Sequence, residues 1–401
     1  MWGNHVCIRF LIAIAIMFPV SLSCKVLVRQ QGVMMNAANG HPLATQTRAA
    51  ALACMEKVQT VAGLGLQGCC SPLFAMADIV ERLTRDPSTS RRVSVVCASR
   101  HMSSEQEGML SSAWPLKFAA QAGAIELPLI YMISSETSAQ LSAFTSESSE
   151  RGIFCNDIET LPSRWPKGAH PWLPLWLLSN RKCQPYDPAD ASEARAITLH
   201  ALRSLYVEGH SGFYYMALHD ESSDAVSALN EAQVAAAVQG MYRLGDAVSG
   251  DAGTRVRLLG AGLALRSVRQ AAGLLREHWA VDCEVWSCPS YTRLAREAGS
   301  ARRWNRFHPG QARRSWHLRD CLGERQDAVV AVTGYPQAVV EQLREYMPGR
   351  FMGVGADSSA LHGLAALSPE WIVVQALTAL AEGGQLGYEP FEQALQRYRL
   401  A

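Results

Sequence analysis

Residues 182–220 read KCQPYDPADASEARAITLHALRSLYVEGHSGFYYMALHD, and this stretch decides the fold. Residues 191–207 space their apolar side chains as a helix does, and the aromatic run within residues 212–219 is typical of a buried strand. Because the helix is followed at once by the strand, the pair completes an α/β unit.

The same alternation continues on both sides of this unit. Further helices are predicted over residues 71–86, 108–124, 232–246, 267–279, 290–298, 336–347, 369–384 and 388–400. Further strands are predicted over residues 91–98, 127–134, 255–262, 281–287, 327–335 and 350–357. We therefore expect an α/β protein of two tandem domains, with mostly parallel sheets flanked by helices.

Two local signals refine this pattern. Ser71 is a suitable N-cap for the helix that begins at Pro72, because proline is favoured in the first turn. Residues 134–149 are rich in Ser, Thr and Glu and are predicted to be a turn-like, mobile segment.

The chain divides into four predicted regions. Residues 1–34 form an apolar N-terminal segment. Residues 35–70 are weakly specified, in that their sequence shows no clear helix or strand pattern. Residues 71–225 and 226–401 are the two predicted domains.

Within the first region, residues 10–24 form an uncharged run of 15 residues, shorter than the roughly 20 that a membrane-spanning helix needs. This run suits a signal peptide, and the alternative is a misassigned start, with translation beginning at Met34 or Met35. We expect a cytoplasmic protein, with export or membrane association left open by this segment.

Composition and charge exclude several classes of function. A chain of 401 residues with 48% hydrophobic residues can bury two or three cores. Its formal net charge of +1 provides no overall field for nucleic acid or an anionic membrane. Eleven cysteines without a C-x-x-C pair indicate buried free thiols in a reducing compartment, without structural zinc.

A glycine turn follows the predicted strand at 255–262. Gly260 and Gly262 precede a helix, and Glu284 lies in the next strand, where a ribose-binding acid is expected in a dinucleotide fold. The third glycine of that fingerprint is replaced by Leu265. A nucleotide-binding module that uses the Gly260–Gly262 turn is therefore one hypothesis.

Residues 182–220 also resemble a known family. The matching positions are Cys183, Tyr186, Asp187, Pro188, Ala189, Glu193, Arg203, Tyr206 and the aromatic run 213–215. They resemble the homodimeric first component of pyruvate dehydrogenase, a thiamine diphosphate-dependent decarboxylase.

The resemblance continues toward the C-terminus. The matching positions there are Thr292, Leu294, Ala295, Arg296, Trp304, Asn305, His308, Pro309, Tyr335, Glu341, Gln342, Tyr346, Pro348, Gly355, Asp357, Leu380 and Gly384. These residues resemble the transketolase-type C-terminal domain of the same family. The preceding domain resembles a degenerate form of its pyrimidine-binding domain.

The family implies thiamine diphosphate and magnesium as cofactors. Gln106-Glu107-Gly108 matches the family's glutamate motif, so the resemblance implies that Glu107 hydrogen-bonds the aminopyrimidine ring of the cofactor. The alternative is an exposed glutamate at a helix start.

Other positions depart from the family. Ser99 and Arg100 replace an acidic pair, and a histidine-rich segment is reduced to a stretch with the single residue His170, which we expect to be structural. We find no Gly-Asp-Gly motif to hold a metal-bound diphosphate; the nearest run, residues 250–253, precedes a strand when it should follow one. No metal site is therefore predicted.

Three hypotheses follow. The chain is a decarboxylase-like protein that is inactive alone and serves as a dimerising or regulatory paralogue; or it is part of a split 2-oxo acid dehydrogenase completed by another chain; or it is the nucleotide-binding module. The expected partners are a second copy or a related decarboxylase chain, and the lipoyl transacetylase that accepts the acyl group.

Overall fold

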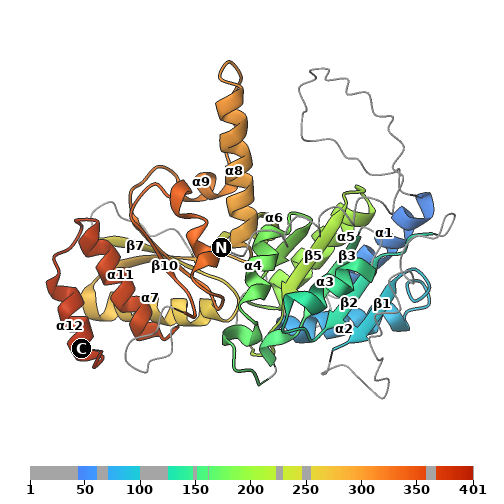
Figure 1. The fold of residues 1–401 in the computed structure, drawn as a ribbon, viewed down its shortest axis with the longest axis horizontal. Helices are drawn as coiled ribbons and strands as arrows, with labels where there is room; N and C mark the ends of the chain where they lie inside the picture. The colour runs from blue at the N-terminus through green and yellow to red at the C-terminus, as the bar shows by residue number, and fades with distance from the viewer. Residues whose placement is uncertain are drawn as a thin grey trace, which may run out of the picture. The chain divides into compact units, whose positions relative to one another are not determined.

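The computed structural model describes residues 44–60, 71–99, 125–147, 151–160, 162–222, 229–245, 254–357 and 367–400. These residues form two five-stranded sheets (Figure 1). Glu107, the predicted helix over 108–124, the apolar run 10–24 and the Gly-Asp run 250–253 lie outside them. Among the described residues, no helix is long and apolar enough to cross a membrane.

The first sheet is entirely parallel, with the strand order β1-β2-β3-β5-β4. Its strands are β1 Ser94–Ala98, β2 Leu129–Ile133, β3 Arg151–Asn156, β4 Cys183–Tyr186 and β5 Gly212–Ala217. Its helices are α1 Thr45–Thr60, α2 Pro72–Arg85, α3 Ser138–Glu147, α4 Trp172–Ser179 and α5 Ala191–Tyr206, with short 3-10 turns η2 Ile158–Thr160 and η3 Pro166–Gly168.

The second sheet has the order β10-β9-β7-β8-β6, and only its edge strand β6 runs antiparallel. Its strands are β6 Tyr242–Leu244, β7 Arg255–Gly260, β8 Asp282–Ser287, β9 Ala328–Val332 and β10 Phe351–Val354. Its helices are α6 Glu231–Gln239, α7 Ala264–Trp279, α8 Tyr291–Phe307, α9 His317–Leu322, α10 Ala338–Glu341, α11 Pro369–Glu382 and α12 Glu389–Arg397, with a 3-10 turn η4 Arg344–Tyr346.

Strand alternation explains why both faces of each sheet are buried. In β2, Tyr131 and Ile133 belong to one apolar core while Ile130 and Met132 belong to another. Successive side chains of a strand point to opposite faces, so a fully apolar strand needs cover on both sides. The fold of two mostly parallel sheets flanked by helices is therefore confirmed.

Three apolar cores result from this arrangement. Helices α1, α2 and α5 pack on one face of the first sheet, and α7, α11 and α12 pack on one face of the second (Figure 1). The third core is continuous between the sheets, because it contains Tyr131 and Phe154 of the first together with Leu259 and Val329 of the second. The two sheets are thus joined by a shared apolar interior.

Several predicted elements differ from the structure. Residues 134–149 were predicted as a mobile turn, but they contain α3, which buries Leu141 and Phe144 in the shared core. The weakly specified region 35–70 contains α1, with Cys54 and Met55 buried against the first sheet. In both segments tertiary burial stabilises a helix that local composition does not indicate.

Two predicted helices are shorter than expected. The helix predicted over 232–246 ends at Gln239, because Gly240 has a φ of 119°, and the chain then forms β6. The helix predicted over 336–347 is broken into α10 and the turn η4. Strands β3 and β4 and helix α4 are additions that the sequence pattern missed.

Candidate functional site between the two sheets

The carboxyl ends of strands from both sheets meet at one place. Asp187 follows β4 of the first sheet, and its N–H donates to the carbonyl of Pro289, which follows β8 of the second (2.7 Å). The N–H of Gly262, which follows β7, donates to the Asp187 carbonyl (3.0 Å). In parallel α/β sheets the carboxyl ends of strands commonly carry ligand sites.

A buried charged cluster occupies this junction. Lys167 donates from Nζ to Asp187 Oδ1 (2.8 Å) and also forms an ion pair with Glu159. The Lys167 side chain is only 2% exposed. Burial alone would lower the pKa of Lys167, but the two carboxylates outweigh burial and raise it, so the ammonium stays charged. The cluster is consequently an ion-pair network shielded from water.

His219 lies beside this cluster, just after β5. It is 2% exposed, and neither ring nitrogen makes a hydrogen bond of normal geometry. Burial, reinforced by the positive charge of Lys167, lowers the pKa of His219 to about 4. The ring is therefore neutral at physiological pH, with one donor and one acceptor nitrogen that a ligand could use.

A second buried carboxylate links α5 to the second sheet. Glu193 Oε1 accepts from the hydroxyls of Tyr242 (2.8 Å) and Ser287, and Oε2 accepts from the N–H of Ala189 (2.7 Å). Burial, with the nearby charge of Asp190, raises the pKa of Glu193 to about 8. Glu193 is thus held by both sheets.

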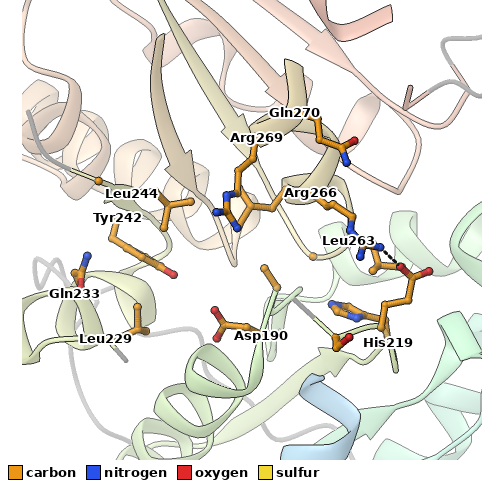
Figure 2. Close-up of a pocket in the computed structure, with 16 residues that line it drawn as sticks. Asp190, His219, Leu229, Gln233, Tyr242, Leu244, Leu263, Arg266, Arg269 and Gln270 are labelled. Atoms are coloured by element: carbon orange, nitrogen blue, oxygen red, sulfur yellow. Dashed lines mark hydrogen bonds and ion pairs between the residues drawn. The ribbon is translucent and has the colours of Figure 1, made fainter. Parts of the chain in front are cut away.

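An open pocket of about 440 Å³ adjoins these groups. Figure 2 shows Arg269 of α7, Tyr242 of β6 and Asp190 at the start of α5 pointing toward one another across it. Arg266 pairs with Glu221 at its rim (2.6 Å). The pocket is lined by Ala189, Asp190, His219, Glu221, Ser222, Leu229, Gln233, Tyr242, Leu244, Gly245, Gly262, Leu263, Leu265, Arg266, Arg269 and Gln270.

The glycine turn at Gly260–Gly262 has a structural use. Gly262 has a φ of 53°, and a Cβ there would lie 2.2 Å from Asp187 Oδ1. Glu284, the expected ribose-binding acid, forms ion pairs with Arg255 (3.5 Å) and Arg257 (3.2 Å). The close approach of Asp187 is enough to explain why position 262 is a glycine. Glu284 is already paired with two arginines of β7.

Other residues singled out in the sequence have local partners. His170 Nδ1 accepts from the N–H of Trp172 (3.3 Å), and its ring packs edge-on against Trp165. Ser99, which replaces an acidic residue of the family motif, donates to Asp157. Over the described ranges, no group of three or more His, Cys, Asp or Glu residues is arranged to hold a metal ion. Glu107 and the ring contact expected of it lie outside the described residues.

Sequence reasoning missed Lys167, Glu159 and His219 as members of one cluster. They lie on three different segments, and no local motif joins them. Asp187 and Glu193 match positions of the family, and this match is the one signal that the sequence offers for them. The structure adds that both are buried between the sheets.

The fold is similar to that of transketolases. Transketolase from Leishmania mexicana superposes with a TM-score of 0.53 over 88% of this chain and 50% of the transketolase, at 15% sequence identity. Residues 240–358 match the transketolase-like TK C-terminal domain family. The chain therefore has a transketolase-like fold and carries that C-terminal domain.

The curated relatives are more specific. The pyruvate dehydrogenase E1 component of Cupriavidus necator is 32% identical over 227 residues, which cover 54% of this chain and 25% of the relative. The E1 component of Pseudomonas aeruginosa is 32% identical over 224 residues, with the same coverage. The similarity lies in the C-terminal half of the chain, and it confirms the resemblance to this family. The match spans about a quarter of the length of these relatives.

Proposed function

We propose that this protein is a pyruvate dehydrogenase E1-like chain that is inactive as a decarboxylase alone and acts as a dimerising or regulatory paralogue. Its partner would be a second copy or a related decarboxylase chain. The lipoyl transacetylase component is a further proposed partner. The proposal rests on similarity over the C-terminal half and on how the junction between the sheets is built.

One observation carries the proposal. The buried charged side chains at the junction form ion pairs with one another: Lys167 is paired with both Asp187 and Glu159. Glu193 likewise accepts hydrogen bonds from Tyr242 and Ser287 across the sheets. A catalytic acid or base must reach a reacting atom. The Lys167 side chain is instead taken up by its own ion pairs, and Glu193 links α5 to the second sheet. This arrangement supports a structural role.

Thiamine diphosphate and magnesium enter as family-implied cofactors. When bound, the cofactor supplies the carbanion chemistry that decarboxylates a 2-oxo acid before transfer of the acyl group to a lipoyl group. Glu107 is the one residue of this chain that we assign to the cofactor, as the hydrogen-bond partner of its aminopyrimidine ring.

Calorimetry tests the proposal. We expect the purified chain to show no heat of binding when thiamine diphosphate is titrated in the presence of magnesium, and no pyruvate-dependent dye reduction. Light scattering should show a dimer or larger assembly. Micromolar binding of the cofactor, or turnover by the chain alone, would contradict inactivity; a monodisperse monomer would contradict the dimerising role.

A split enzyme is the second candidate, and the motif Gln106-Glu107-Gly108 favours it. In this case another chain supplies the diphosphate-binding domain across an interface. Mixing the protein with the N-terminal diphosphate-binding portion of the Cupriavidus necator E1 component should then restore pyruvate-dependent dye reduction. Glu107→Gln should abolish that activity without changing assembly, and a mixture that stays inactive would exclude this pairing.

A further inference from the structure

A basic arm projects from the second sheet. We define the basic arm as residues 299–314, which read GSARRWNRFHPGQARR and contain five arginines and no acidic residue. It comprises the C-terminal half of α8 and the loop that follows, and Figure 1 shows α8 extending away from both sheets to a loop at its tip. In a chain of net charge +1, this is a concentrated positive surface.

Side-chain contacts connect the two segments that form the tip of the arm. The Trp304 ring stacks on His308 at a centroid distance of 3.6 Å, and the Arg314 guanidinium lies 3.5 Å from the Trp304 centroid. Asn305 and Arg314 exchange two hydrogen bonds, Asn305 Nδ2 to the Arg314 carbonyl (2.9 Å) and Arg314 N–H to Asn305 Oδ1 (2.8 Å). The outgoing and returning segments are therefore fastened together.

The root of the arm is fastened as well. Arg296 donates to four main-chain carbonyls that belong to α4, to β4 and to the turn between them. This contact ties α8 to the first sheet. A rigid arm loses little conformational entropy when it binds a partner, so its side chains are presented in advance.

Three of the five arginines in the basic arm form no ion pair within the described part of the chain. Arg302 pairs with Glu345 (2.8 Å), and Arg314 stacks on Trp304. By contrast, Arg303, Arg306 and Arg313 are exposed and form no ion pair with any carboxylate in the described part of the chain. Phe307, which lies among them, is 69% exposed.

We propose that the basic arm is a docking surface for an acidic segment of a partner protein, with Arg303, Arg306 and Arg313 pairing with its carboxylates and Phe307 contacting an apolar side chain. Arginine and aromatic residues are the types enriched in protein interfaces. Nucleic acid is the less favoured partner because a nucleic-acid-binding domain is typically strongly basic as a whole, whereas this chain has a net charge of +1.

The test uses the full chain and a fluorescent 16-residue peptide of glutamate and aspartate with a central leucine, in 50 mM salt. We expect Arg303→Glu, Arg306→Glu and Arg313→Glu together to weaken binding by about tenfold or more, because close charge pairs become repulsive. Phe307→Ala should weaken it by roughly threefold to tenfold through lost apolar contact.

Controls separate the arm from general charge. The matched variant carries Arg85→Glu, Arg91→Glu and Arg92→Glu, which are exposed at the end of α2 and in the segment before β1 of the first sheet. It should bind the peptide within about twofold of the natural protein, because salt screens charges that do not contact the peptide. Both variants should keep the natural circular dichroism spectrum. Equal loss in the two triple variants, or tighter binding of a 16-base-pair DNA duplex than of the peptide, would overturn the proposal.

Discussion

Gly262 and Asp187 are in such close contact that a Cβ on Gly262 would lie 2.2 Å from the Asp187 carboxylate. Gly262 belongs to the turn after β7, and Asp187 directly follows β4, so this contact joins the two sheets. The contact explains why position 262 is a glycine, which the sequence alone would suggest is part of a dinucleotide-binding turn.

Gly262→Ala is expected to destabilise the protein by about 2 to 4 kcal/mol, because a methyl group there adds a clash to an unfavourable positive φ. Urea unfolding measures the change. Gly273→Ala is the matched control: nothing lies within 4 Å of a Cβ at Gly273, which is an exposed position of α7. That substitution should raise the free energy of unfolding by up to about 1 kcal/mol. Equal effects of the two substitutions would show that the contact is unimportant.

Lys167→Met is expected to lower the free energy of unfolding by about 3 to 5 kcal/mol, since it leaves the buried carboxylates of Asp187 and Glu159 without a counter-charge. A double-mutant cycle with Asp187→Asn checks the cause. The double variant should be clearly more stable than the sum of the two single effects predicts. Additive losses would mean that Lys167 and Asp187 do not interact.

Glu193 should make stability depend on pH. Its pKa is raised to about 8 in the folded protein, so the folded state binds more protons than the unfolded state between the ordinary value of 4.5 and about 8. The free energy of unfolding should therefore fall as pH rises through this window. The stability that protonation of Glu193 contributes is fully present only below the ordinary pKa of 4.5.

Glu193→Gln removes that titration while keeping an amide that can hydrogen-bond. The slope should flatten by up to about 1.4 kcal/mol per pH unit, as measured by urea unfolding at several pH values from 5 to 8. The exposed Glu56→Gln variant should retain the natural slope, because Glu56 is a surface residue of α1. A Glu193→Gln curve parallel to that of the natural protein would contradict the assignment.

Arg296→Lys tests the attachment of α8. Arg296 donates to the carbonyls of Cys183 (2.5 Å), Leu177 (3.0 Å) and other residues of the first sheet, and a lysine cannot reproduce this planar set of donors. We expect a loss of about 2 to 3 kcal/mol, whereas Arg302→Lys, at an exposed ion pair, should cost less than about 1 kcal/mol. Calorimetric unfolding that is identical for the two variants would disprove a special role for Arg296.

Much of the secondary structure could be predicted from local pattern. In β7, Leu259 packs into one core while Val256 and Leu258 pack into another, because both faces of the sheet are covered. Helix α2 begins at Pro72 because Ser71 Oγ accepts a hydrogen bond from the Phe74 N–H (3.0 Å). Such signals reside in neighbouring residues. They were sufficient for the fold class and for the family resemblance.

Helix α3 and the charged junction were decided only by tertiary structure. α3 is polar in sequence and is stabilised by burying Leu141 and Phe144 against the first sheet. Lys167, Asp187 and His219 come together because the neighbouring strands β4 and β5 end side by side and the turn η3 lies next to them. Burial and charge pairing act through space, so the sequence supplied the residue types while the packing of the two sheets decided their partners and their pKa values.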